Sequence, residues 1–191
     1  MSKIAIVTGG SRGIGNAIAL DLLDKGYRVG VGYYKNKSLA EEIAKKNTHA
    51  LPLHIDIASP ESIEKAFNEI ENNYGSVDIL INNAGISQVK SFESLEDEDW
   101  QIMWETNFMS AVRCIKLALP SMIKKGEGKI INIASIGGQW GGVHQVHYAA
   151  AKAALINLTK SIAESYSKDG IRCNAVSPGL INTDMISDEL K

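Results

Sequence analysis

The chain has 191 residues, of which 45% are hydrophobic and 22% charged, and its formal net charge is -2. This balance is ordinary for a folded, water-soluble protein and excludes the basic surface that nucleic-acid binding requires. The two cysteines lack metal-ligand spacing, and no apolar run is long enough to span a membrane, so we expect neither a disulfide framework, nor a metal site, nor membrane association. We expect one cytoplasmic domain, residues 1–191.

The N-terminal segment has the pattern of a buried strand followed by a nucleotide-binding turn. The apolar run Ile4–Val7 predicts the strand, and residues 17–25 predict a helix. Between them lies Thr8-Gly9-Gly10-Ser11-Arg12-Gly13-Ile14-Gly15. Such a turn lets backbone N–H groups and a helix N-terminus contact a pyrophosphate. The spacing of Gly9, Gly13 and Gly15 departs from the standard Gly-x-Gly-x-x-Gly pattern, so a tight turn without a ligand is the alternative.

The end of the second predicted strand, residues 28–34, indicates which dinucleotide is bound. An acidic residue about 20 positions after the glycines would bind a ribose 2′-hydroxyl and repel a 2′-phosphate. The positions here are Tyr33, Tyr34, Lys35, Asn36 and Lys37, none of them acidic. Arg12 adds a positive charge, so we expect NADP(H) rather than NAD(H). The alternative is that Lys35 and Lys37 are merely solvated.

Two further strands, residues 50–55 and 77–81, are each followed by candidate ligand contacts. Asp56 and Ile57 follow the first, and Asp56 either contacts the adenine or is a plain loop aspartate. Asn82-Asn83-Ala84-Gly85 follow the second, and such small and amide residues allow a ligand close to the backbone. Two helix starts are also predicted, a capping box at Ser38 and an N-cap at Ser59 before Pro60.

A long helix is predicted after the cap Ser94-Leu95-Glu96-Asp97, with a buried stripe at helical spacing. The stripe is Trp100, Met103, Trp104, Phe108, Ala111, Ile115 and Leu119. Pro120 should kink or end the helix. Asn107 is a poor helix former in this position, so either it caps a local break or its amide acts in an active site.

Strand 129–134 leads to Ser135, and a helix over residues 147–168 follows. Tyr148 and Lys152 lie four residues apart, on the same face of that helix. An ammonium within about 4–6 Å of a phenol lowers a pKa near 10 by about 1–3 units, which makes the phenol a tunable proton donor. The helix is apolar almost all round, which indicates a subunit interface.

A sixth strand, Ile171–Val176, precedes Ser177-Pro178-Gly179. Strands and helices alternate throughout the chain. This alternation predicts an α/β fold, a doubly wound parallel sheet with helices on both faces.

Several motifs together resemble the short-chain dehydrogenase/reductase family, in its order and spacing over essentially the whole chain. They are Thr8 to Gly15, Asn82-Asn83-Ala84-Gly85, Asn107, Ser135, Tyr148-x-x-x-Lys152 and Pro178-Gly179. Within the family the chain most resembles reductases of 3-oxoacyl-[acyl-carrier-protein] and acetoacetyl-CoA. The resemblance implies a Rossmann-type fold. It also implies a homodimer or homotetramer, and a substrate that is a small molecule or a carrier-bound acyl group.

The resemblance further implies NADPH-dependent reduction of a 3-oxoacyl thioester to the 3-hydroxyacyl form. Tyr148 would be the general acid, and Lys152 would lower its pKa and bind the nicotinamide ribose. Ser135 would bind the carbonyl oxygen, and Asn107 would orient a water that relays protons. The alternatives are an oxidoreductase of another ketone or a sugar alcohol, and a sensor or scaffold that binds NADP(H) without chemistry.

The resemblance also assigns the ligand contacts. The cofactor contacts are Gly9, Ser11, Arg12, Gly13, Ile14, Gly15, Tyr34, Lys35, Asp56, Ile57, Asn83, Ala84, Gly85, Tyr148, Lys152, Pro178, Gly179, Ile181 and Thr183. The substrate contacts are Ser135, Gln145 and Tyr148, and Gln139, Trp140, His144 and His147 surround the entrance, with both histidines as rim residues. Family members continue beyond the equivalent of Lys191, so we expect the C-terminal end of the fold, with one side of the substrate pocket, to be missing.

Overall fold

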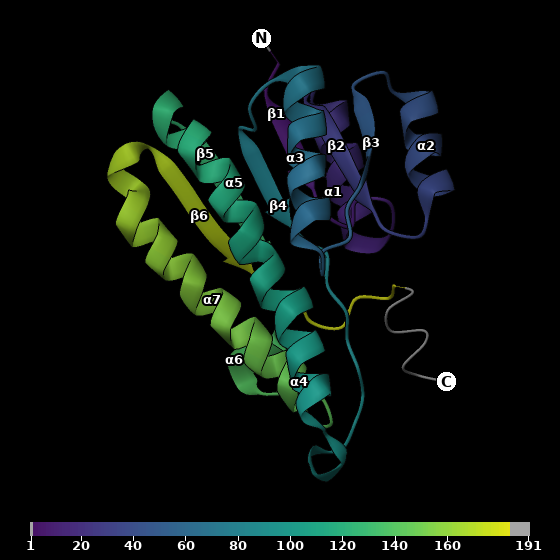
Figure 1. Cartoon of the computed structure of the whole chain (residues 1–191), viewed down its shortest axis with the longest axis vertical. Coiled ribbons are helices and arrows are strands. Elements are labelled where there is room, and N and C mark those ends of the chain that lie inside the picture. Colours follow the sequence, from purple (N-terminus) through teal and green to yellow (C-terminus); the bar gives the residue numbers. More distant parts are fainter. Residues whose placement is uncertain (1, 184–191) are drawn as a thin grey trace.

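Six parallel strands form the sheet of this structure, a computed structural model that describes residues 2–183. In chain order they are β1 (Ile4–Val7), β2 (Arg28–Tyr33), β3 (Ala50–His54), β4 (Ile79–Asn82), β5 (Gly128–Ile133) and β6 (Ile171–Val176). Their order across the sheet is β3-β2-β1-β4-β5-β6, with every neighbouring pair parallel. The chain moves outward from β1 to β3 and then returns to the other side of β1 (Figure 1). This order confirms the predicted Rossmann-type doubly wound sheet.

Helices cover both faces of the sheet. One face is covered by α1 (Gly13–Asp24) and α2 (Lys37–Lys46), and the other by α3 (Pro60–Tyr74), α5 (Ser110–Lys125) and α7 (Val146–Tyr166) (Figure 1). Strand β1 contributes to both cores, since Ile4 and Ile6 pack on the second face while Ala5 and Val7 pack on the first. Successive side chains of a strand point to opposite faces, so a strand buried on both sides is apolar at every position.

The long helix predicted after Ser94 consists of three consecutive parts. They are α4 (Asp97–Trp104), a π-helical turn (Glu105–Met109) and α5. The predicted cap at Ser94 was two residues early, because the N-cap is Glu96, which forms a capping box with Asp99. The capping box predicted at Ser38 was also wrong, since α2 already begins at Lys37 without a side-chain cap.

The π-helical turn explains why the predicted buried stripe was only partly correct. Met103, Ala111 and Ile115 are buried, but Trp100 and Trp104 are 36% and 42% exposed. A π turn adds a residue to the helical turn, which rotates the positions after it by about 100° relative to a regular α-helix. A constant helical period therefore does not describe one face across this segment.

Pro120 lies inside α5 and does not end it, contrary to one of the two predicted outcomes. The proline itself is exposed, whereas Ala118 and Met122 on either side of it are fully buried. Burial of these two side chains offsets the cost of about 3 kcal/mol that a proline imposes in a helix interior. The helix continues to Lys125, and Gly126 ends it with a φ of 69°.

The last long helix, α7, ends at Tyr166, two residues before the predicted end, and a short 3-10 turn follows it. Its Ala150 and Ala153 are exposed. The subunit interface expected on this helix therefore stays a prediction. Among residues 2–183, none of the helices combines the length and apolar character that a membrane crossing needs.

The start of α3 provides a test of the local stability of the fold. Ser59 Oγ accepts the backbone N–H of Ser62 at 3.2 Å, ahead of Pro60 at the first helical position. We expect Ser59→Ala to lower the free energy of unfolding by about 1 kcal/mol, measured by urea denaturation, because this N–H loses its acceptor. Ser38→Ala is the matched control, since Ser38 is exposed inside α2 and should give almost no loss. Equal losses in the two variants would contradict the assignment of Ser59 as a cap.

Candidate active site

A cavity of about 920 Å³ lies at the carboxyl ends of the strands, where the sheet order reverses between β1 and β4. It is lined by the segments that follow all six strands, together with the start of α7. Open parallel sheets bind their ligands at this position, and the volume is at the upper end of the range for ligand sites. The predicted contacts from distant parts of the chain, except Gly15, line this cavity.

The turn between β1 and α1 forms a cradle suited to a phosphate group. Gly9 and Gly13 have φ values of 62° and 55°, in the left-handed region that glycine adopts without strain. Helix α1 begins at Gly13 with no side-chain cap and no acidic residue in its first turn. Its first N–H groups and the positive end of its dipole are therefore suited to a pyrophosphate.

Gly15 has a different place from the one predicted. It is buried and does not line the cavity, and a Cβ there would collide with the backbone oxygen of Gly9. The absence of a side chain lets α1 pack closely under the turn, which is a structural role rather than a ligand contact.

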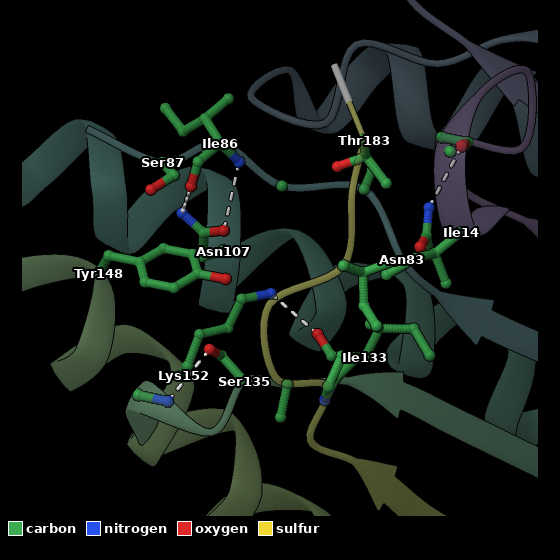
Figure 2. A pocket seen from close by; sticks show the side chains of 18 of the residues that line it. Ile14, Asn83, Ile86, Ser87, Asn107, Ile133, Ser135, Tyr148, Lys152 and Thr183 are labelled. Carbon is green, nitrogen blue, oxygen red and sulfur yellow. Dashed lines mark hydrogen bonds between the residues drawn. The ribbon is translucent and has the colours of Figure 1, made fainter. Parts of the chain in front are cut away.

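The turns after β1 and β4 are fastened together by hydrogen bonds from Thr8 and Asn83. Asn83 Nδ2 donates to the backbone oxygens of Thr8 and Gly9, at 3.0 and 3.2 Å. Thr8 Oγ1 accepts the N–H groups of Asn83 and Ala84, both at 3.0 Å. Asn83 thus lines the cavity beside Ile14 while it fixes the backbone of the glycine turn (Figure 2).

The far end of the cavity is bounded by the segments after β2 and β3. Tyr34, Lys35 and Asn36 line it from β2, and Lys35 Nζ lies 5.6 Å from the centre of the Tyr34 ring. Lys37, by contrast, does not line the cavity and forms an ion pair with Glu41. The two lysines considered in the sequence therefore differ, and only Lys35 is placed to meet a ligand.

Asp56 has the hydrogen bond of a loop aspartate and also lines the cavity, while its contact with the adenine stays a prediction. Its Oδ1 accepts the N–H of Ala58 at 3.0 Å, as a loop aspartate commonly does, and the residue also lines the cavity beside Ile57.

Tyr148, Lys152 and Ser135 converge at the end of β5 (Figure 2). The Lys152 side chain is only 4% exposed, and its Nζ donates to the backbone oxygen of Ile133 at 2.8 Å. Nζ lies 5.7 Å from the centre of the Tyr148 ring. Burial lowers the pKa of Lys152 from 10.5 to about 8.

Ser135 Oγ accepts the N–H of Gly137 at 3.1 Å, at the start of α6 (Gly137–Trp140). Because the oxygen accepts this bond, the hydroxyl hydrogen can donate to a ligand in the cavity.

Asn107 lies in the π-helical turn, the local break that the sequence suggested, and it also lines the cavity. Its Nδ2 donates to the backbone oxygens of Ile86 and Met103, at 3.0 and 3.2 Å, and its Oδ1 accepts the N–H of Ile86 at 3.3 Å. The amide thus fixes the segment after β4, while a proton-relaying water at this residue stays a prediction. π-Helical turns are frequent at functional sites.

A buried polar chain that sequence reasoning missed fastens α7 to the sheet. Asn82 Nδ2 donates to Asn132 Oδ1 at 2.8 Å, and Asn132 Nδ2 donates to Thr159 Oγ1 at 2.9 Å. Asn82 and Asn132 are register partners on β4 and β5. Their signal in the sequence was an asparagine near the end of each of two strands that are rich in isoleucine.

The predicted entrance residues separate into two groups. Trp140 and Gln145 line the cavity, whereas Gln139, His144 and His147 do not. Gln139 donates to Ser177 at 3.3 Å. His147 is only 1% exposed, so its prediction as a rim residue was wrong: its ring packs edge-on against Trp100, with ring centres 6.0 Å apart.

Some of the residues that line the cavity directly follow the recognised motifs and were not predicted from the sequence. Ile86, Ser87, Ile136 and Leu180 line the cavity. Each lies within two residues of a motif, and that proximity was the available signal. Among residues 2–183, His, Cys, Asp and Glu side chains form no group of three that could bind a metal ion.

The Rossmann-type crevice, the phosphate cradle and the Tyr148–Lys152 pair beside Ser135 together define a nicotinamide-dependent oxidoreductase. A family model described as short chain dehydrogenase matches residues 3–191. The 3-oxoacyl-[acyl-carrier-protein] reductase FabG of Staphylococcus aureus is 39% identical over 100% of this chain and 80% of that protein. The chain belongs to the short-chain dehydrogenase family.

Solved structures show the same fold. A short-chain dehydrogenase from Streptomyces avermitilis superposes with a TM-score of 0.91 at 30% identity, covering 97% of this chain and 68% of its own. A structure titled ribose-5-phosphate isomerase from Brucella melitensis has a TM-score of 0.92 at 30% identity, covering 99% and 72%. Structures named for different activities share this fold. The fold alone therefore does not assign an activity, which has to be inferred from the side chains of the site.

The buried Lys152 leads to a prediction about stability and pH. Between pH 8 and 10.5 the unfolded chain binds more protons at this lysine than the folded protein does, so its effect on the unfolding free energy becomes more favourable as pH rises. We expect the unfolding free energy of the wild type minus that of Lys152→Met to increase by about 1–2 kcal/mol from pH 8 to pH 9.5, measured by urea denaturation. Lys160→Met, at an exposed lysine of the same helix, gives the baseline. A difference that stays constant with pH would contradict the lowered pKa of Lys152.

Proposed function

We propose that this protein uses NADPH to reduce a 3-oxoacyl thioester to the 3-hydroxyacyl thioester. The observation that carries the proposal is the convergence of Tyr148, Lys152 and Ser135, with Asn107 nearby, on one cavity that also contains the phosphate cradle. The thioester is suggested by the relatives, which are named reductases of 3-oxoacyl groups on the acyl carrier protein.

In the proposed reaction, a bound nicotinamide supplies a hydride to the carbonyl carbon of the substrate. Tyr148 donates its phenolic proton to the carbonyl oxygen as negative charge develops there. The positive charge of Lys152 favours the phenolate that remains, and its Nζ can reach the nicotinamide ribose. Ser135 donates a hydrogen bond to the same carbonyl oxygen and stabilises its charge. Asn107 orients a water that returns a proton towards Lys152.

The cofactor preference follows from the charges around the far end of the cavity. Arg12 and Lys35 both line it, and no acidic residue follows β2 at the position that would bind a 2′-hydroxyl. A 2′-phosphate would gain two cationic neighbours there, and the segment after β2 would present no repelling carboxylate. The remaining contacts predicted for the cofactor, including Pro178, Gly179, Ile181 and Thr183, close the cavity from the segment after β6.

The substrate class is supported by the apolar part of the cavity lining. Ile86, Trp140 and Leu180 line the cavity, and Trp140 and Leu180 are 82% and 84% exposed. An aliphatic acyl chain could cover these surfaces, which a small polar ketone or a sugar alcohol would leave in water.

We also propose a homodimer or homotetramer formed through α4, the π-helical turn and α7, which pack together. The rings of Trp104 and Phe108 lie 4.4 Å apart, and Trp104 is partly exposed next to a helix whose Ala150 and Ala153 are also exposed. A second copy of the chain would remove this apolar surface from water.

The proton donor is tested with Tyr148→Phe, which keeps the ring and removes the hydroxyl. We expect kcat for reduction of acetoacetyl-CoA to fall at least about 100-fold, while the Kd for NADPH changes little, because only the proton transfer is lost. Oxidation of NADPH is followed by absorbance and its binding by fluorescence. Tyr166→Phe, at a tyrosine of the same helix that does not line the cavity, is the control.

The wild-type protein separates the alternative functions in the same assay. Turnover of other ketones or of sugar alcohols without turnover of acetoacetyl-CoA would favour a different oxidoreductase. NADPH binding with no turnover of any carbonyl compound would favour a sensor or scaffold. Full activity of Tyr148→Phe would contradict the mechanism.

The cofactor preference is tested with Lys35→Asp. We expect the ratio of kcat/KM with NADPH to kcat/KM with NADH to fall at least about tenfold, because a carboxylate repels a 2′-phosphate and can bind a 2′-hydroxyl. Lys37→Asp is the matched control, since Lys37 is paired with Glu41 outside the cavity lining. A higher kcat/KM with NADH in the wild-type protein would overturn the assignment of NADPH.

A further inference from the structure

Two segments that are distant in sequence are joined along one side of the cavity. The N–H of Lys90 donates to the backbone oxygen of His144 at 2.8 Å. Gln145 Nε2 donates to Ser87 Oγ at 2.8 Å, and His147 Nε2 lies 2.9 Å from Gln88 Oε1. We call residues 86–90 and 144–147 together the paired wall. These bonds connect the segment after β4 to the first turn of α7, directly before Tyr148.

The paired wall has a front, which faces the cavity, and a back, which does not. Ile86, Ser87 and Gln145 line the cavity, and Figure 2 shows Ser87 on the same side of the site as the Tyr148 ring. Gln88 and His147 do not line it. Neither of these back residues can touch a ligand in the cavity, so any effect they have on the reaction must pass through the front residues.

The directions of the hydrogen bonds behind the wall are fixed by Asp99. Its carboxylate accepts from Lys90, from the backbone N–H of Glu96 at 2.9 Å and from Gln88 Nε2 at 3.0 Å. These bonds, with Lys90 first among them, lower the pKa of Asp99 to about 2. Because a carboxylate only accepts, Gln88 must present its Nε2 to Asp99 and its Oε1 to His147. His147 must therefore carry its proton on Nε2 and act as the donor.

The environment of the other ring nitrogen, Nδ1, indicates that the His147 ring is neutral and donates a single hydrogen bond. Its Nδ1 is buried and has no hydrogen-bond partner among the described residues. A second proton there would be a buried donor without an acceptor, close to the positive end of the α7 dipole. Burial lowers the pKa of His147, Lys90 acts in the same direction, and Asp99 opposes them.

We propose that His147 and Gln88 are positioning residues, which lock Ser87 and Gln145 against the substrate through a single N–H donor at Nε2. The chain of bonds runs from the N-terminus of α4, through Asp99 and Gln88, to the N-terminus of α7. The identity of the substrate in this inference rests on the proposed function. The phosphate cradle lies after β1, outside the wall, so we expect the wall to act mainly on the substrate rather than on NADPH.

The proposal is tested with three replacements of His147 in the full-length protein. Phe keeps the ring and removes the donor; Gln places an amide N–H near the position of Nε2, and Asn places one near that of Nδ1. We expect His147→Phe and His147→Asn to raise the KM for acetoacetyl-CoA about tenfold, with kcat and the KM for NADPH within about twofold, because Gln88 Oε1 is left without a donor. His147→Gln should restore a KM close to that of the wild type. His49→Phe, at an exposed histidine outside the cavity lining, is the matched control.

A loss of folding would lower the fraction of active enzyme, and so the apparent kcat, rather than raise KM. As a second variant, Gln88→Met breaks the same bond from the partly exposed side. It should reproduce the KM of His147→Phe. An unchanged KM in His147→Phe, or a raised KM that His147→Gln does not restore, would overturn the proposal. So would a fall in kcat with an unchanged KM, because this pattern would assign His147 to the chemistry.

Hydrogen exchange provides a readout that does not depend on the substrate. The amide of Lys90, bonded to His144, should exchange faster in His147→Phe and Gln88→Met, and at the wild-type rate in His147→Gln. If wild-type protein does not turn over acetoacetyl-CoA, the proposed function fails while this measurement still decides whether the wall is locked. Equal exchange in all the variants would overturn the locking.

Discussion

The buried ammonium of Lys152 is the constraint on which the rest of the site depends. Removal of a charged group from water is costly, and here one backbone oxygen among the described residues, that of Ile133 at the end of β5, accepts from the ammonium at 2.8 Å. The cost of burying this charge appears as the lowered pKa of Lys152. An arrangement of this kind persists only if helix and strand are fixed relative to each other, so the surrounding structure must supply rigidity from elsewhere.

That rigidity comes from polar bonds within an otherwise apolar interior. The chain from Asn82 through Asn132 to Thr159 connects two central strands to α7, while Asn107 fixes the segment after β4 from inside a π-helical turn. Directional hydrogen bonds between buried polar groups favour one relative position of the elements that carry them. Helix α7 is thus located by directional bonds at its middle and by the Lys152 bond near its start.

The parallel sheet and both helical layers were predictable because most strands are rich in apolar residues and the connections between them have a helical pattern. The failures have physical causes. A π-helical turn changes the helical phase, so Trp104 was assigned to the core although it is partly exposed. His147 is buried by contacts with Trp100 and Gln88, which are distant in sequence. Gly15 was misassigned because a glycine needed for close packing and one that contacts a ligand look identical in sequence.

The two ends of the cavity are built from different chemical groups. The cradle after β1 presents backbone N–H groups, which every residue type except proline possesses, whereas the front of the paired wall presents the side chains of Ser87 and Gln145. Replacement of those side chains changes the surface of the wall without disturbing the backbone of the cradle. Single substitutions in the wall can therefore change which carbonyl compound is preferred, while the cradle at the other end of the cavity stays the same. A library randomised at positions 87 and 145 would explore new substrates on a constant cofactor platform.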